Sequence, residues 1–190
     1  MFYGEKKLTK KGCIMEVIAE TERLLLRVFN EMDVEDAKAF WGDQEVMEHC
    51  LGAIPHDHLH KALAAYAACH QEKGLSVYAV IEKESNRVIG SAGFNVRTTI
   101  ESVELLYHFS KTAWGKGYAT EAATACVDFA IKNPNLKMIY ASAESKNTGS
   151  LKILEKVGFE YKGMKWFDDT NQEEPYYELN IKVKVKNGST

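Results

Sequence analysis

The chain has 190 residues, of which 45% are hydrophobic, and it carries a formal net charge of −3 at pH 7. This length and apolar content fit a single domain around one substantial core. Without a general excess of positive charge, neither a nucleic acid nor an anionic membrane surface is an expected partner. The sequence has no apolar run long enough to serve as a signal sequence or a membrane span.

The cysteines indicate a reducing environment. They are widely separated, and no two of them form the CxxC pair that is typical of zinc sites and redox motifs. We therefore expect reduced thiols, no disulfide framework and a cytoplasmic location. The four are Cys13, Cys50, Cys69 and Cys126.

The chain divides into three parts by composition. Residues 1–20 are lysine-rich near their start and form an N-terminal extension, which either frays or packs on the domain. Residues 21–186 are expected to form the domain itself. Residues 187–190 form a short polar tail.

The first elements of the domain are a strand and two helices. Residues 23–29 are a short apolar run flanked by charge, which predicts a strand. Asp33 has the position of an N-cap for a helix that extends through Trp41. Residues 55–73 have apolar side chains at helical spacing, and Gly74 lies just past the predicted end of that helix.

The middle of the chain predicts three consecutive strands followed by a helix. Residues 76–83 and 87–96 form a hairpin, because a short polar turn joins them. A third strand at about 102–110 leads into a glycine pair and then into a helix that ends near Lys132. One face of this helix is apolar and packs on a sheet, and the other is polar.

The remaining elements alternate between strand and helix. We predict a strand over 136–143, a helix over 148–157 and strands over 159–166 and 176–185. Hairpins combined with βα alternation favour one α/β domain with a central mixed sheet. The last strand alternates along its length and offers an edge through which two copies of the chain could form a homodimer.

The segment from Thr112 to Ala119 contains Gly115 and Gly117 between a predicted strand and a predicted helix. Unpaired N–H groups and the positive end of a helix dipole suit a phosphate or pyrophosphate there. A glycine pair at such a turn can equally serve only the backbone conformation. The P-loop signature is missing, and Thr120 stands where a dinucleotide-binding motif needs its third glycine.

The loop also carries a family resemblance. Residues 114–122 resemble the pyrophosphate loop of the GNAT superfamily of acyl-CoA-dependent N-acetyltransferases. Residues 21–27, 43–47, 147–150 and 154–159 resemble the Rim-type branch, which acetylates ribosomal-protein N-termini. The matches follow the family's order from about Thr21 to Ile181.

This resemblance implies a fold and a cosubstrate. The fold would be α/β, with α+β mixing, in a single GNAT-like domain whose central sheet is mixed, mostly antiparallel, bulged and splayed, with flanking helices. The cosubstrate would be acetyl-CoA (coenzyme A), and no metal is implied. The residues that would bind it are Phe109, Trp114, Gly115, Lys116, Gly117, Tyr118, Ala119 and Asn147, with a backbone N–H near Phe109 polarising the acetyl carbonyl.

The reaction implied is acetyl transfer to a primary amine by direct attack in a ternary complex. Glu104 is the candidate base, acting directly or through water, although a strand glutamate is often only solvent-facing. The resemblance makes Ser150 the candidate proton donor for the thiolate. Asn147 has an alternative role, because a residue of this type before a helix is a good N-cap.

Three positions depart from the family pattern. Thr112 replaces a usual Gln or Arg before the loop, Leu106 replaces a glycine near an expected β-bulge, and Leu154 replaces a frequent tyrosine acid. These departures motivate an alternative, a non-catalytic acyl-CoA-binding regulatory module. A plain interaction domain without affinity for coenzyme A is a third possibility.

The acceptor amine is not identified by the sequence and can be a protein N-terminal α-amine or a small molecule. Acidic residues in two segments, 40–60 and 166–175, could attract a cationic amine, although such charges are usually solvated. Trp41 lies in one of these segments, while tryptophans most often pack in cores. His56, His58 and His60 have no carboxylate at a fixed spacing and are poor evidence for zinc. The acids are Glu45, Glu48, Asp168 and Asp169.

Overall fold

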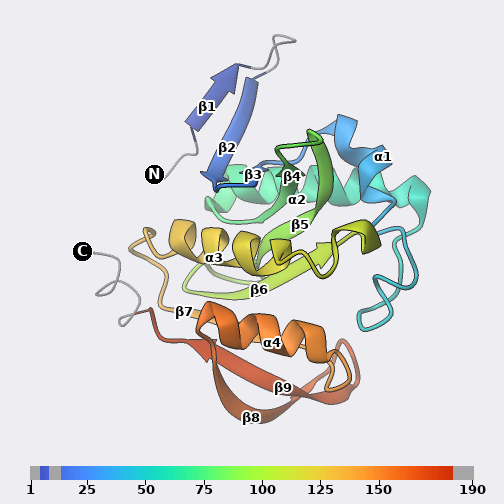
Figure 1. The fold of residues 1–190 in the computed structure, drawn as a ribbon. Coiled ribbons are helices and arrows are strands. Elements are labelled where there is room, and N and C mark those ends of the chain that lie inside the picture. Colours follow the sequence, from blue (N-terminus) through green and yellow to red (C-terminus); the bar gives the residue numbers. More distant parts are fainter. Residues whose placement is uncertain (1–4, 9–13, 182–190) are drawn as a thin grey trace.

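The computed structural model describes residues 5–8 and 14–181, in which nine strands form one sheet (Figure 1). The strand order is β1-β2-β3-β4-β5-β6-β7-β9-β8, and β6 and β7 are the one parallel pair of neighbours among the described strands. The strands are β1 Glu5–Leu8, β2 Ile14–Glu20, β3 Leu24–Arg27, β4 Val77–Glu82, β5 Arg87–Asn95, β6 Ser102–Phe109, β7 Met138–Ser142, β8 Glu160–Phe167 and β9 Gln172–Leu179.

Helices cover both faces of this sheet, and each face has its own apolar core. On one face α3 and α4 pack over Tyr78, Phe94 and neighbouring side chains, and on the other α1 and α2 pack over a core that contains Phe40 and Trp41 (Figure 1). The predicted α/β fold with a mixed, mostly antiparallel sheet is thus confirmed. The helices are η1 Glu31–Asp33, α1 Val34–Ala37, η2 His56–His58, α2 Leu59–Lys73, η3 Lys111–Ala113, α3 Tyr118–Ala130 and α4 Thr148–Val157.

The sheet splays open between β6 and β7. These strands pair only where residues 102–104 face residues 138–140, and beyond Glu104 strand β6 continues along β5 alone. The β-bulge expected near Leu106 is absent, because the β5–β6 register is uniform from Asn95–Glu104 to Gly90–Phe109. Irregularities in register occur instead between β2 and β3, β4 and β5, and β8 and β9.

Three local signals place element ends as predicted. Gly74 adopts φ +76° directly after α2, and Asn86 adopts φ +54° in the turn of the β4–β5 hairpin. Gly158 adopts φ +101° after α4, and its N–H donates to the carbonyl oxygens of Leu154 and Glu155. A left-handed residue that returns hydrogen bonds to the last turn is a common way to end a helix.

The first helix corrects the sequence prediction. Asp33 occupies the predicted N-cap position of α1, but its side chain makes no cap hydrogen bond to that helix, and the regular helix ends at Ala37 rather than at Trp41. The side-chain cap lies at the preceding η1, where the Asn30 side chain accepts from the Met32 N–H and the Asp33 carboxylate accepts from the Asn30 N–H. The Asp33 carboxylate is buried and also accepts two hydrogen bonds from the Arg27 guanidinium, at 2.7 and 2.6 Å.

Residues 14–20 of the N-terminal extension form β2, which pairs with β3. At the other end of the sheet, the strand order differs from expectation. The sequence suggested that the last strand offers an open edge for a homodimer. β9, which begins at Gln172, instead lies between β7 and β8 and has no open edge. The edge strand is β8, because tertiary pairing sets strand order. Residues 182–185 of the predicted last strand lie outside the described residues.

Within the described residues, no helix is long and apolar enough to cross a membrane. Cys50, Cys69 and Cys126 are free thiols, and Cys13 lies outside the described residues.

Replacing Asp33 with alanine should lower the free energy of unfolding by about 3–5 kcal/mol, because it leaves the Arg27 guanidinium buried without its partner. Chemical denaturation measures the change. The matched control is Glu35→Ala on the same short helical segment, where an ion pair with Lys38 involves a glutamate side chain that is 79% exposed. That control should change stability by less than about 1 kcal/mol. A loss below about 1 kcal/mol for Asp33→Ala would contradict the importance assigned to the buried pair.

Candidate functional site

The glycine loop between β6 and α3 presents backbone donors. Gly115 and Gly117 adopt φ +73° and +80°, a conformation that strains residues with a side chain. Gly117 is the N-cap of α3 and offers no side-chain cap, and the first helical hydrogen bond joins the Glu121 N–H to the Gly117 carbonyl. The N–H groups of residues 118–120 therefore lack partners within the helix and face the loop. This arrangement suits a phosphate group.

Arg23 supports the loop from the position just before β3. Its Nη1 donates to the Lys116 carbonyl at 2.9 Å, and its Nε donates to the Glu121 carboxylate at 2.8 Å. Thr21 Oγ1 donates to the other oxygen of the same carboxylate at 2.6 Å. Partial burial acts to raise the pKa of Glu121, but these hydrogen bonds outweigh it and hold that pKa below its ordinary value. The sequence analysis missed this role of Arg23, because nearly a hundred residues separate the partners.

Tyr118 contributes to the loop through its backbone. Its side chain is buried, and its hydroxyl donates to Glu82 Oε1 at 2.6 Å at the end of β4. The Arg23 guanidinium lies 4.6 Å from the centre of the Tyr118 ring. The ring thus anchors the start of α3 and keeps a positive charge beside the loop.

Trp114 joins the loop to the end of β6. Its indole Nε1 donates to the Phe109 carbonyl oxygen at 2.8 Å, while 49% of the residue remains exposed. At the same end, the Ser110 N–H donates to the Ile89 carbonyl on β5. Donors alternate between the two sides of a strand, so the Phe109 N–H is directed away from β5. It faces the side of β6 from which β7 has departed.

The side chains of β6 divide between the two faces of the sheet. Val103, Leu105 and Phe109 belong to the core beneath α3 and α4. The alternate residues Glu104, Leu106 and His108 are directed to the face of α1 and α2. The open stretch of β6 is therefore bordered by two chemically distinct environments.

Glu104 occupies the last paired position between β6 and β7, opposite Tyr140. Its carboxylate accepts hydrogen bonds from Asn95 Nδ2 at 3.2 Å and from the Arg97 guanidinium at 3.3 Å, and its side chain is 15% exposed. Arg97 also donates to Asp169 at 2.6 Å, which holds the pKa of Asp169 below its ordinary value. The Glu104 carboxylate is thus fixed by hydrogen bonds where β6 and β7 separate, and it is not freely solvated.

His108 and Trp41 are hydrogen-bonded on the same face. The Trp41 indole Nε1 can only donate, so His108 Nδ1 accepts this 3.2 Å bond and the ring is neutral. Burial lowers the pKa of His108 to about 4. His108 Nε2 lies 3.5 Å from the Cys50 Sγ. Trp41 is itself a core residue, as tryptophans usually are.

Most of the acidic residues proposed to attract an amine have partners. Glu45 accepts from Lys111 Nζ at 2.9 Å, and Asp168 accepts from Trp166 Nε1 at 2.9 Å. A further acid, which the sequence analysis did not select, is Glu144, whose Oε2 lies 2.6 Å from His49 Nδ1. This contact joins the segment before α2 to the loop between β7 and α4.

Asn147 and Ser150 lie at the start of α4. The Asn147 side-chain oxygen accepts from the Ser150 N–H at 3.1 Å, which is the N-cap role that its position suggested. The Ser150 Oγ lies 3.0 Å from the Tyr107 hydroxyl of β6. The sequence analysis did not predict this contact. Thr112, one of the departures from the family pattern, has its hydroxyl 3.2 Å from that of Ser110.

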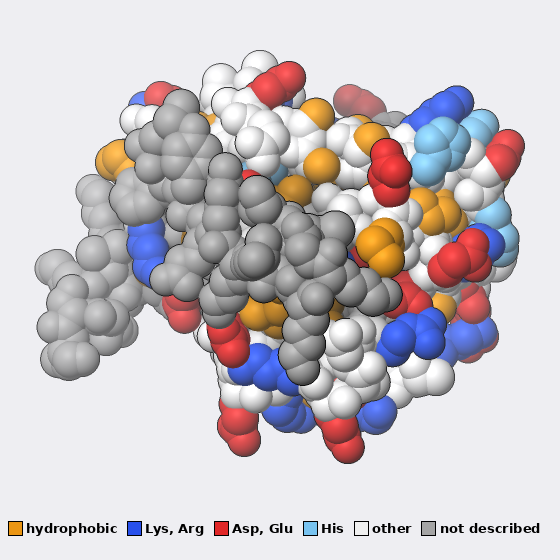
Figure 2. Space-filling model, turned by 90° about the horizontal axis from the view of Figure 1, so that it is seen from above, with side chains coloured by type: hydrophobic (Ala, Val, Ile, Leu, Met, Phe, Trp, Pro, Cys, Tyr) orange, Lys and Arg blue, Asp and Glu red, His pale blue; other side chains and the backbone are white. Residues whose placement is uncertain are grey.

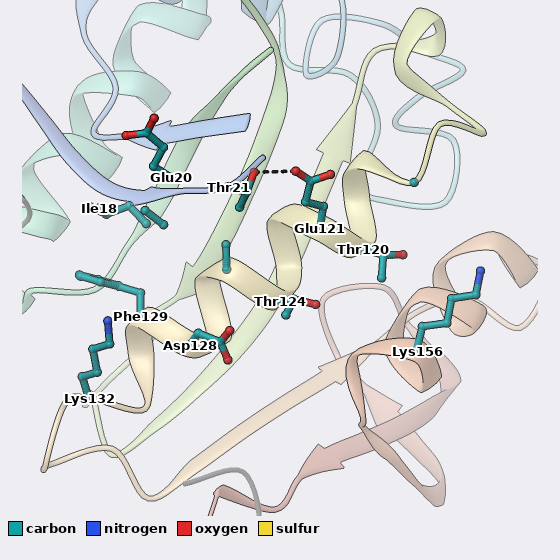
Figure 3. Close-up of a pocket in the computed structure, with 13 residues that line it drawn as sticks. Ile18, Glu20, Thr21, Thr120, Glu121, Thr124, Asp128, Phe129, Lys132 and Lys156 are labelled. Carbon is teal, nitrogen blue, oxygen red and sulfur yellow. Dashed lines mark hydrogen bonds between the residues drawn. The ribbon is translucent and has the colours of Figure 1, made fainter. Parts of the chain in front are cut away.

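A groove of about 680 Å³ runs along the outer face of α3 (Figure 3). One wall is formed by residues 18–21, and Lys156 projects from α4 on the other side. The predicted polar face of α3 lines it through Thr120, Glu121, Thr124 and Asp128. The groove reaches the glycine loop at Gly117 and does not include the open side of β6.

The described residues contain no group of three or more His, Cys, Asp or Glu side chains arranged to hold a metal ion. Of the three histidines near the start of α2, His56 contacts the Gly42 carbonyl through Nε2 at 3.3 Å. On the face in Figure 2, acidic and basic side chains are interspersed outside the grey region.

Comparison with protein-family models matches residues 23–160 to the acetyltransferase (GNAT) domain. A relative from Bacillus licheniformis, described as the uncharacterized N-acetyltransferase p20, is 32% identical over 151 residues, which cover 76% of this chain and 83% of the relative.

Solved structures share the fold. An acetyltransferase of the GNAT family from Bacillus anthracis has a TM-score of 0.76 and 25% identity, covering 86% of this chain and 98% of that one. RimL, a ribosomal L7/L12 α-N-protein acetyltransferase solved in complex with coenzyme A, has a TM-score of 0.68 and 14% identity, covering 86% and 97%. The latter likeness concerns the fold alone.

Acidification should destabilise the protein through His108. Its pKa is about 4 in the folded state, against an ordinary value near 6.5, so the unfolded chain binds the proton first as the pH falls. Stability from this group is complete above about pH 7.5 and falls as the pH decreases to 4, by about 3 kcal/mol.

Denaturation midpoints measured at several pH values would test this. The control is His108→Asn, whose side-chain oxygen can still accept from Trp41 Nε1 but does not titrate. The variant should lose less stability between pH 6.5 and 4 than the wild type. Equal losses in the two proteins would rule out a contribution from His108.

Proposed function

The chain belongs to the GNAT acetyltransferase family and is an N-acetyltransferase, and we propose that it moves the acetyl group of acetyl-CoA to a primary amine by direct attack in a ternary complex. One observation carries this proposal. The backbone N–H of Phe109 faces the open side of β6, in the same strand that leads into the glycine loop. A phosphate cradle and a carbonyl-polarising donor thus lie on one continuous segment.

Acetyl-CoA would be held by backbone groups more than by side chains. The N–H groups of Gly117, Tyr118 and Ala119 would bind the pyrophosphate, with Lys116 and Arg23 supplying positive charge. Gly115 would allow the close approach, and Trp114 holds the end of β6 in place. The pantetheine arm would follow the open side of β6, near Asn147 at the start of α4.

Acetyl-CoA supplies a thioester whose acetyl group passes to the amine with release of the thiol. The Phe109 N–H would donate to the carbonyl oxygen as negative charge develops on it. Glu104 would accept the proton that the amine must lose, directly or through one water molecule. Ser150 would give a proton to the sulfur as the carbon–sulfur bond breaks.

The acceptor would approach from the face of α1 and α2. Glu104 is directed to that face, whereas the glycine loop and Ser150 belong to the elements on the α3 and α4 side. Glu144 and Asp169 border the same region and favour a cationic amine. A protein N-terminal α-amine and a small-molecule amine both meet this description.

Gly117→Glu should weaken acetyl-CoA binding by at least about 100-fold, since it puts a carboxylate where the phosphates would lie. Calorimetric titration measures the affinity. The matched control is Gly74→Glu, which makes the same change at φ +76° after α2, where no atom lies within 4 Å of an added Cβ; at Gly117 the nearest atom is Arg23 Nη2 at 3.6 Å. Both variants should lose similar stability, but only Gly117→Glu should lose affinity. Unchanged affinity would show that the loop does not bind the donor.

Glu104→Gln should lower kcat by about 100-fold at pH 7, because the amine would have to lose its proton to solvent. The residual rate should rise steeply with pH as more of the amine becomes neutral. Release of free thiol across a panel of peptide and small-molecule amines provides the assay.

The control is Glu101→Gln, an exposed glutamate just before β6 that pairs with Lys137. It should keep kcat within about twofold of the wild type. Equal effects of the two substitutions would remove Glu104 from the mechanism. Donor binding without turnover of any amine would overturn the proposed activity and favour the non-catalytic acyl-CoA-binding module.

A further inference from the structure

Tyr107 crosses from the sheet to α4. Its side chain lies on the face of α3 and α4, packed against their core. The hydroxyl lies 3.0 Å from the Ser150 Oγ and also 3.0 Å from the Ser150 carbonyl oxygen. A single phenol thus contacts two atoms of one residue in the first turn of the helix.

This contact lies at the open stretch of β6. Tyr107 is two residues before Phe109, so its backbone N–H is also directed away from β5, towards the side that β7 has left. Ser150 is fixed in turn, because its N–H donates to the cap residue Asn147. The two hydroxyls therefore border the gap opposite the face that carries Glu104.

We propose that Tyr107 is a positioning residue that orients the Ser150 hydroxyl towards the departing sulfur of the donor and replenishes its proton. The proposal rests on the proposed function, because it concerns the proton that acetyl transfer must deliver to the thiolate. Nothing in the family resemblance assigned a role to Tyr107.

Counting protons shows what the contact does. The phenol has one hydrogen, which can be donated to the Ser150 carbonyl oxygen or to the Ser150 Oγ. In the second arrangement the serine hydrogen must point elsewhere. With acetyl-CoA bound in the gap, that hydrogen can be directed at the sulfur of the thioester. Without Tyr107, the serine hydroxyl is free to rotate away, for example to a backbone carbonyl within its own helix.

The proposed proton transfers account for every proton and for the electron pair of the broken bond. As the carbon–sulfur bond breaks, its electron pair stays on sulfur and takes the Ser150 proton, while Ser150 takes the phenol proton of Tyr107. Solvent returns a proton to Tyr107, and solvent has received one from the amine through Glu104. Burial raises the pKa of Tyr107, so the phenol remains protonated and able to donate throughout the neutral range.

Tyr107→Phe tests this inference, because it keeps the ring that packs in the core and removes only the hydroxyl. We expect kcat to fall about tenfold, with KM for acetyl-CoA within about twofold of the wild type. The control is Tyr161→Phe, the same change on the edge strand β8, where the tyrosine is 55% exposed. The control should keep the wild-type kcat.

A double variant separates positioning from simple packing. If Tyr107 acts through Ser150, then Tyr107→Phe should have no further effect on kcat in a Ser150→Ala background. A merely structural contact predicts instead that the two losses multiply and that KM rises with them. Multiplying losses, or a kcat for Tyr107→Phe within twofold of the wild type, would overturn the inference alone. Absence of turnover in the wild type would overturn the proposed function and this inference together.

Discussion

The structure depends on one short parallel contact, the three residue pairs that join β6 to β7. All other neighbouring strands among the described residues pair in antiparallel fashion, so this contact is where the two halves of the sheet meet. Three pairs are too few to hold the halves together. The helices supply the rest, because α3 and α4 pack on each other and share one core with strands from both halves. The sheet can therefore open beyond Glu104 without separating.

Opening a sheet leaves backbone groups without strand partners, which is costly unless something else binds them. The Phe109 carbonyl is satisfied by the Trp114 indole, a side chain from the loop that follows. The N–H groups on the same side of β6 face the gap, where water or an extended ligand can accept from them. The feature that weakens the sheet thus leaves free backbone donors along β6, and the adjoining glycine loop presents further N–H groups.

Short-range patterns in the sequence were sufficient for much of this fold. The β4–β5 hairpin, α2 with its terminal Gly74 and the glycine turn before α3 each depend on residues close together in the chain. The failures involve contacts that no local pattern encodes. Asp33 precedes α1 as expected, but its carboxylate is engaged by the buried Arg27 guanidinium instead of capping that helix. The interior place of β9 follows from its pairing with β7, which no local pattern encodes. The same holds for Arg23 and Glu121 beneath the loop.

In the proposed mechanism, the alternation of β6 lets one strand serve two opposite proton transfers. Acetyl transfer removes a proton from the amine and delivers one to the sulfur, and the two sites lie on opposite sides of the thioester. Glu104 and Tyr107 are an odd number of positions apart, so their side chains point to opposite faces of the sheet. The Glu104 carboxylate then lies on the face of α1 and α2, where the acceptor would approach, and the hydroxyls of Tyr107 and Ser150 lie on the face of α3 and α4. A shift of the strand by one residue would exchange the two groups, so the proposed chemistry requires the uniform β5–β6 register as much as the fold does.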